Sequence, residues 1–131
     1  MSYLSHADLG GRPNAERVRP EPEGELFHAA WEPRALALTL AMGATGRWNI
    51  DTSRAARETL PNYANLSYYQ IWIAALQKLL AERQLALPEE LAAGRALHPT
   101  VPVARVLKAP DVAAALVKGS PTERSIAAPA R

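Results

Sequence analysis

The segment 68–83 constrains the fold most, because its apolar residues recur at the spacing of an amphipathic α-helix. Trp72, Leu76 and Leu79 fall at positions i, i+4 and i+7 of this segment. Ser67, directly before it, is a residue type favoured at the N-cap of a helix. The sequence therefore predicts a helix whose apolar side must pack against other parts of the chain.

Further helices are predicted over 27–45, 50–60, 88–93 and 111–118. Asn49 or Asp51 can cap the second of these, and Pro61 ends it. The segment 27–45 carries apolar residues on more than one face, which suggests contacts on two sides. No repeat and no β-hairpin pattern is present. We therefore predict a mostly α fold, a small helical domain with long extended arms at both ends.

Residues 1–24 contain six Pro and Gly residues and little apolar material, so we expect an extended N-terminal arm. We assign 25–96 to the helical domain, and 97–131 to an extended segment that carries one short helix and a C-terminal tail. A helical piece with so much arm seldom exists alone. We therefore expect the arms to wrap a partner subunit.

Composition excludes several classes of function. The chain has 131 residues and no Cys, which rules out disulfides, thiolate metal sites and Cys nucleophiles. Its three His are scattered, so we predict no metal site in this chain. A net charge of +2 demands neither nucleic acid nor a membrane. The polar first 25 residues and the short apolar run 35–44 lead us to expect a cytoplasmic protein.

Candidate chemistry is sparse, and the chain by itself does not look like an enzyme. Tyr68 and Trp72 lie one turn apart on a helix face, where they can serve core packing or a ligand. Arg54 stands beside the small residues Ala55 and Ala56. It is either a solvated charge or a fork of donors for a buried anion.

The run ELFHAAWEPRALALTLAMGATGRWNIDTSR, followed by SYYQIWIAALQKLLAERQL, resembles the N-terminal half of the nitrile hydratase β subunit. HADLGG is similar to the His-Asp-x-Gly-Gly arm of that family, with Ala7 inserted between His6 and Asp8. GSPTERSIAAPAR resembles the linker that ends this half. The family's β chain usually continues into a small β-barrel, whereas this sequence stops at Arg131. We therefore expect a small separate subunit to carry the barrel.

The resemblance implies a nitrile hydratase, a lyase that hydrates a nitrile to an amide, with this chain as the β-type subunit and inactive alone. It implies cobalt(III), in preference to iron(III), in a partner α-type subunit that holds the metal by partly oxidised Cys. By position, Arg54 matches the catalytic Arg that contacts those oxidised Cys groups. Ile50, Ser53, Tyr68 and Trp72 match substrate-pocket positions. Ser53 is small for its position, which suggests a roomier pocket.

Other readings stay open. The β-type subunit of thiocyanate hydrolase and the nitrile hydratase activators, which are maturation proteins, resemble the same half. SYYQIW and WNIDTSR look closer to nitrile hydratase, and the Gly-Gly arm with its linker-like tail favours a structural subunit. An unrelated helical interaction module is the third reading.

Overall fold

The computed structural model describes residues 5–7 and 16–119, and this part of the chain contains helices and no strand. The α-helices are α1 (Glu32–Gly43), α2 (Ile50–Glu58), α3 (Tyr68–Glu82), α4 (Pro88–Ala93) and α5 (Val112–Lys118). Two 3₁₀ turns, η2 (Tyr63–Asn65) and η3 (Ala109–Asp111), lie between them. The mostly α prediction is confirmed. Half of the predicted arm (1–4 and 8–15) and the tail 120–131 lie outside the described residues, and the wrapping of a partner stays a prediction.

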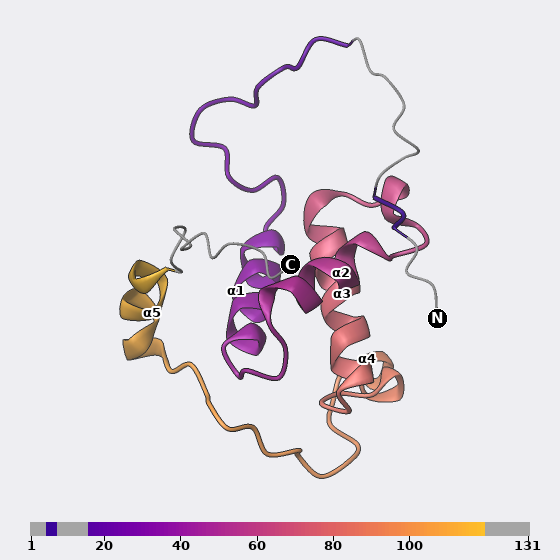
Figure 1. Ribbon diagram of the computed structural model, residues 1–131, viewed down its shortest axis with the longest axis vertical. Helices are drawn as coiled ribbons and strands as arrows, with labels where there is room; N and C mark the ends of the chain where they lie inside the picture. Colours follow the sequence, from indigo (N-terminus) through magenta and orange to yellow (C-terminus); the bar gives the residue numbers. More distant parts are fainter. Residues whose placement is uncertain (1–4, 8–15, 120–131) are drawn as a thin grey trace, which may run out of the picture.

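Helix α3 is the centre of the fold, with α1 and α2 packed against it (Figure 1). The buried core is built from Trp48, Ala56, Leu60, Ala75, Leu76 and Leu79. Ala56 of α2 and Ala75 of α3 are small, which lets the two helix backbones approach closely. Among the described residues, no large side chain is completely buried. The core of this chain is therefore thin.

Helix α1 is shorter at both ends than the predicted 27–45. At its start, the Glu32 carboxylate accepts a 2.6 Å hydrogen bond from the backbone N–H of His28, which bends the preceding residues into a turn. At its end, the Thr45 hydroxyl donates to the Met42 carbonyl at 2.6 Å and competes with the next helical bond. Gly46 then adopts a φ of +76° and turns the chain away.

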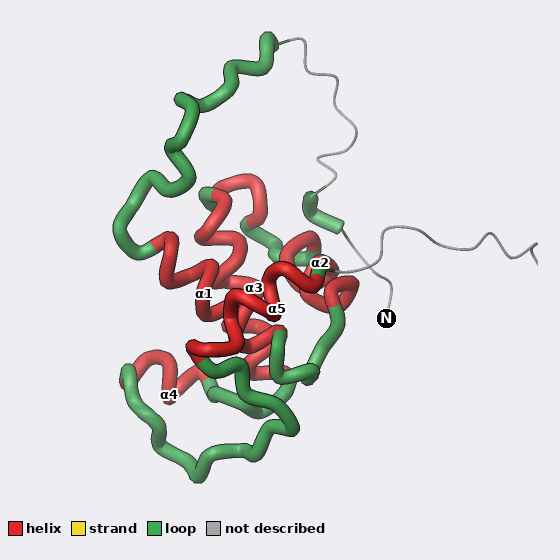
Figure 2. The backbone as a smooth tube through the Cα atoms, turned by 90° about the vertical axis from the view of Figure 1, so that its left-hand side faces the viewer, coloured by secondary structure: helices red, strands yellow, loops and turns green. Residues whose placement is uncertain are grey.

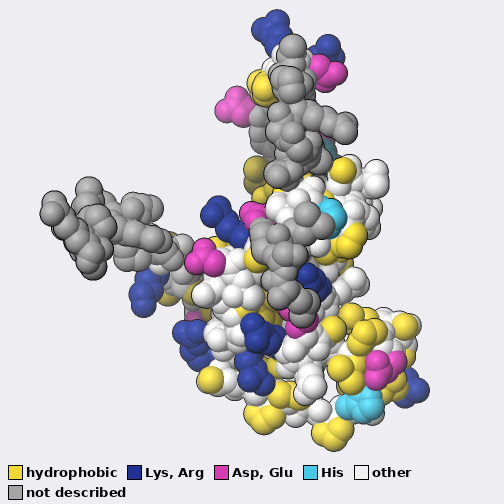
Figure 3. Space-filling view, turned by 45° about the vertical axis from the view of Figure 1, so that its right-hand side comes forward, with side chains coloured by type: hydrophobic (Ala, Val, Ile, Leu, Met, Phe, Trp, Pro, Cys, Tyr) yellow, Lys and Arg dark blue, Asp and Glu magenta, His cyan; other side chains and the backbone are white. Residues whose placement is uncertain are grey.

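The prediction that α1 contacts two sides is met on one side only within the described chain. Ala35 is buried, and Met42 packs against the core. Leu38 and Leu40 are 47% and 39% exposed. The exposed face of α1 is therefore available to another chain. On another face of the molecule, Figure 3 shows hydrophobic side chains at the surface beside a His side chain.

Capping fixes the ends of the two helices that carry the candidate site. The Asn49 side-chain oxygen accepts a 2.8 Å hydrogen bond from the Thr52 N–H at the start of α2, as predicted. The Gln70 side chain accepts a 2.8 Å bond from the Ser67 N–H at the start of α3. Helix α2 ends at Glu58 and α3 at Glu82, within two residues of the predicted ends.

The chain after α3 returns toward α1 through an extended segment (Figure 2). Helix α4 has its predicted bounds and is followed by Gly94 at a φ of +64°. Helix α5 also lies where the sequence predicts it. Its residue Leu116, together with Leu107 before it, lies beside α1 and α2. No helix in 5–7 and 16–119 combines the length and the hydrophobicity that a membrane span requires.

Candidate functional site

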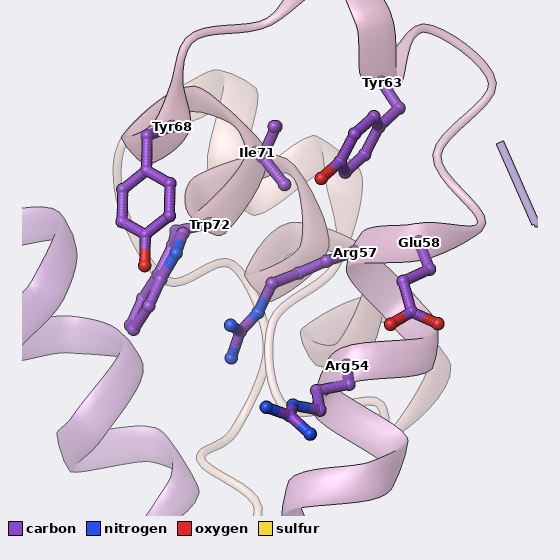
Figure 4. A pocket seen from close by; sticks show the side chains of 7 residues that line it. All are labelled: Arg54, Arg57, Glu58, Tyr63, Tyr68, Ile71 and Trp72. Atoms are coloured by element: carbon purple, nitrogen blue, oxygen red, sulfur yellow. The ribbon is translucent and has the colours of Figure 1, made fainter. Parts of the chain in front are cut away.

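Helices α2 and α3 enclose a hollow of about 160 Å³ that combines positive charge with aromatic rings (Figure 4). Its charged walls are two arginines and a glutamate from α2, and its aromatic walls come from η2 and α3. The lining residues are Arg54, Arg57, Glu58, Tyr63, Tyr68, Ile71 and Trp72. We call this hollow the arginine pocket.

Helical spacing explains why these side chains meet. Arg54 and Arg57 are three residues apart on α2, and Tyr68 and Trp72 are four apart on α3, so each pair shares a helix face. The two rings of the α3 pair lie 5.7 Å apart. Because α2 packs on α3, the two faces oppose each other across the pocket.

Arg57 is the most constrained charged group of the pocket. Its guanidinium carbon lies 4.2 Å from the centroid of the Trp72 ring, a cation–π arrangement. Its Nη2 donates a 3.0 Å hydrogen bond to the hydroxyl of Ser53. Burial lowers the pKa of Arg57, and the nearby Arg54 charge lowers it further, while Tyr68 and Glu58 act in the opposite direction. An arginine remains protonated under such a shift, so the group keeps its positive charge.

Arg54 differs from Arg57 because its side chain is exposed at the rim of the pocket. Within the part of the chain that the structure describes, no hydrogen bond or ion pair engages its guanidinium. The Glu58 carboxylate in the same wall offsets one of the two guanidinium charges, so the pocket keeps an excess of one positive charge. The arrangement therefore suits a negatively charged group presented from outside.

A second hollow of about 350 Å³ adjoins the first and is mainly apolar. Ile50 and Ser53 of α2 line it, together with Trp48 and side chains of α1 and α5. Arg57 and Trp72 line both hollows. We call this second hollow the apolar groove.

The structure thus places the five sequence-predicted site residues in two adjoining hollows. Arg54 and Tyr68 line the arginine pocket, Ile50 and Ser53 line the apolar groove, and Trp72 lines both. Ile50 and Tyr68 are 65% and 64% exposed, whereas Ser53 is buried.

Trp72 is half-buried and lies outside the buried core cluster, so core packing is not its main environment. Instead it belongs to an aromatic group that extends to the end of the N-terminal arm. Its ring lies 5.8 Å from Tyr69, and Tyr69 lies 5.5 Å from Phe27. Phe27 therefore packs on Tyr69, which in turn packs on the Trp72 ring.

Sequence reasoning missed several lining residues. Tyr63 lies outside every helix that the sequence predicts, but the 3₁₀ turn η2 after Pro61 aims it into the arginine pocket. Trp48 and Leu107 reach the apolar groove from segments far apart in the sequence. For Tyr63, the local sequence signal is its place two residues after Pro61, where a turn is expected.

Among the described residues, Glu58 is the one His, Cys, Asp or Glu that lines either hollow. Among residues 5–7 and 16–119, no three His, Cys, Asp or Glu side chains are grouped so that they could hold a metal ion. The whole sequence contains no Cys. Residues 1–131 therefore supply no thiolate ligand next to these hollows.

Comparisons with known proteins identify the family of this chain. Residues 4–115 match the family model of the nitrile hydratase beta subunit, N-terminal. The chain is 37% identical over 71 residues to the low-molecular weight cobalt-containing nitrile hydratase subunit beta of Rhodococcus rhodochrous. This match covers 53% of this chain and 31% of that protein. It is 30% identical over 91 residues to the nitrile hydratase subunit beta of Pseudomonas putida, covering 68% of this chain and 42% of that protein.

The chain therefore matches 31% and 42% of the length of these two curated relatives. The family match includes all the lining residues of the arginine pocket and those of the apolar groove from Thr39 to Ala115, with Leu116 just beyond its end. It also includes His6 of the N-terminal arm and Phe27, which follows the arm. This chain belongs to the nitrile hydratase β-subunit family and corresponds to the N-terminal part of that subunit.

Proposed function

We propose that this chain is the β-type, non-metal-binding subunit of a nitrile hydratase, which hydrates a nitrile to an amide. The observation that carries the proposal is the arginine pocket, in a chain whose family is that of nitrile hydratase β subunits. The pocket offers two guanidinium groups and three aromatic rings, which suit a chain that completes a site whose metal is held elsewhere.

The partner would be an α-type subunit that carries the metal on a Cys cluster with oxidised sulfurs. When bound, such a metal acts as a Lewis acid or activates water. Cobalt is the preferred metal, since one relative is named as cobalt-containing. A small third subunit would carry the β-barrel part that the longer relatives have room for.

Arg54 is proposed to hydrogen-bond the oxidised sulfurs of the partner. Its guanidinium is exposed at the pocket rim and lacks a described partner, so its donors are available to an incoming anion. A guanidinium can donate two parallel hydrogen bonds to such oxygens. Arg57 adds positive charge behind it.

The apolar groove is proposed to hold the organic part of the nitrile. Ile50 and Trp72 give it apolar and aromatic walls, and Tyr68 stands at the mouth of the neighbouring pocket. Burial of apolar substrate surface against such walls is favourable by roughly 25 cal/mol per Å².

Co-expression with the α-type and barrel subunits encoded nearby tests the proposal. We expect one co-purifying complex that contains cobalt and hydrates nitriles, while the chain alone does neither. Stoichiometric cobalt or iron on the isolated chain would contradict the proposal. A chain that binds the metal-free α-type subunit but is absent from the active enzyme would be an activator instead.

A further inference from the structure

Ser53, Arg57 and Trp72 form one connected unit between the two hollows. The Ser53 hydroxyl accepts the 3.0 Å hydrogen bond from Arg57, and the same guanidinium covers the Trp72 ring at 4.2 Å. Arg57 and Trp72 are the residues that line both hollows. Figure 4 shows the Arg57 side chain extending from α2 toward the indole of Trp72.

We propose that Arg57 is a positioning and specificity-determining residue, which Ser53 orients, and which fixes the Trp72 ring and separates the arginine pocket from the apolar groove. This inference rests on the proposed function, because it assigns the end wall of the same substrate groove.

The geometry explains why the three residue types are needed together. Ser53 and Arg57 are four residues apart on α2, so the helix itself brings the hydroxyl under the guanidinium. A guanidinium can donate from its edge while its flat face stacks on an aromatic ring, whereas an ammonium group presents a single point charge. The small Ser53 is buried, and in this structure the space beside it is taken by the Arg57 guanidinium.

Arg57 and Arg54 therefore have different roles although both line the arginine pocket. Arg57 is half-buried and engaged by two neighbours of the same chain, while Arg54 is exposed. The lowered pKa of Arg57 reflects its burial. A group held in this way forms a fixed wall, which limits how far a substrate in the groove can extend toward the pocket.

Loosening this wall should favour larger substrates. In the co-purified complex, we would compare Ser53→Ala, Arg57→Lys and Arg57→Met with the unaltered chain, using acetonitrile and benzonitrile. Loss of one hydrogen bond at about 1 kcal/mol predicts a shift of roughly fivefold in the ratio of kcat/KM values toward benzonitrile for Ser53→Ala. The shift should be larger for Arg57→Met, with metal content unchanged. Arg83→Lys, at the exposed end of α3, is the control.

Tryptophan fluorescence of the full chain gives a readout that does not depend on turnover. Arg57→Met should change the emission, and the change should disappear when Trp72 is replaced by Phe, because the cation acts on that ring. Ser53→Ala removes a single oxygen atom and keeps the test open if Arg57→Met does not fold.

The two proposals fail differently. If the unaltered complex hydrates nitriles, but the variants keep its substrate ratio and its Trp72-dependent emission, the positioning role of Arg57 is wrong. If the emission changes depend on Trp72 while the unaltered complex hydrates no nitrile, the positioning of Trp72 holds and the proposed function is wrong.

Discussion

The backbone N–H of His6 donates a 2.7 Å hydrogen bond to the carbonyl oxygen of Glu58, the last residue of α2. Carbonyls in the last turn of a helix lack partners within the helix, so this bond satisfies one of them. Glu58 also lines the arginine pocket. The beginning of the described chain is therefore attached to the helix that carries the candidate site.

We predict that assembly protects the N-terminal arm from proteolysis. Arg17 is exposed and gives trypsin a cleavage site, and Val18 on the other side of the bond is 85% exposed, whereas Pro20 blocks cleavage after Arg19. The isolated chain should be cut there within the first minutes of a limited digest, whereas the complex should resist. Mass spectrometry of the fragments locates the cuts, and equal rates in both states would show that no partner covers the arm.

Arg54→Lys should leave the complex assembled but reduce its turnover roughly tenfold to a hundredfold. The lysine keeps the charge but loses one charge-assisted hydrogen bond, at about 1.5–3 kcal/mol. Turnover, metal content and complex size should be measured together, with Arg83→Lys as the surface control. Near-normal turnover at full metal occupancy would remove Arg54 from the site.

The tryptophans at positions 48 and 72 should respond differently to replacement by alanine. Trp48 is 9% exposed and belongs to the core, so Trp48→Ala should destabilise the chain by about 3–5 kcal/mol. Trp72→Ala should mainly alter substrate preference, since the ring lines both hollows. Denaturant unfolding and assembly assays on both variants make the comparison. Equal loss of folding would place Trp72 in the core after all.

Asn49→Ala should destabilise the chain by about 1 kcal/mol, because the N-cap bond to Thr52 is lost. Asn49→Asp should restore most of the loss, since the carboxylate can accept the same bond. Asn62→Ala is a matched control, as Asn62 precedes η2 without a side-chain capping bond. Urea unfolding monitored by circular dichroism measures all three variants.

Glu90 should make the stability of the chain depend on acid pH. Its carboxylate accepts hydrogen bonds from the backbone N–H groups of Leu87, Leu97 and His98, which lower its pKa. A lowered pKa in the folded state means that the stabilisation is complete above the unfolded value of about 4.3 and is lost as the pH falls through the folded value.

Thermal unfolding between neutral and strongly acidic pH tests this prediction. Glu90→Gln should lower the melting temperature at neutral pH and flatten its acid dependence. Glu89→Gln is the control, because Glu89 contacts only the exposed ring of His98. The same acid dependence in the Glu90→Gln variant and in the unaltered chain would assign it to other groups.

Local signals predicted the short helices well. Pro88 and Gly94 bracket α4, and Gly119 follows α5, so the sequence alone determined their bounds. The ends of α1 were predicted less well, because they depend on side chains. The bonds of Glu32 to His28 and of Thr45 to Met42 shorten the helix, and the apolar pattern contains no sign of them.

In the candidate site, too, contacts within one helix were predictable from the sequence, whereas contacts between helices were not. Tyr68 and Trp72 share a helix face by spacing, so their proximity was predictable. The contact of Arg57 with Trp72 joins two helices, and the separation of the two hollows depends on it. Such contacts follow from how α2 packs on α3, and a single sequence contains no direct record of that packing.

The thin core affects the abundance of this protein in the cell. With no large side chain completely buried in the described chain, the isolated subunit has little stability of its own. Binding to a partner adds a stabilisation that grows with the logarithm of the free partner concentration. We therefore expect the abundance of this chain to follow the supply of its partner, with unassembled copies removed by proteases.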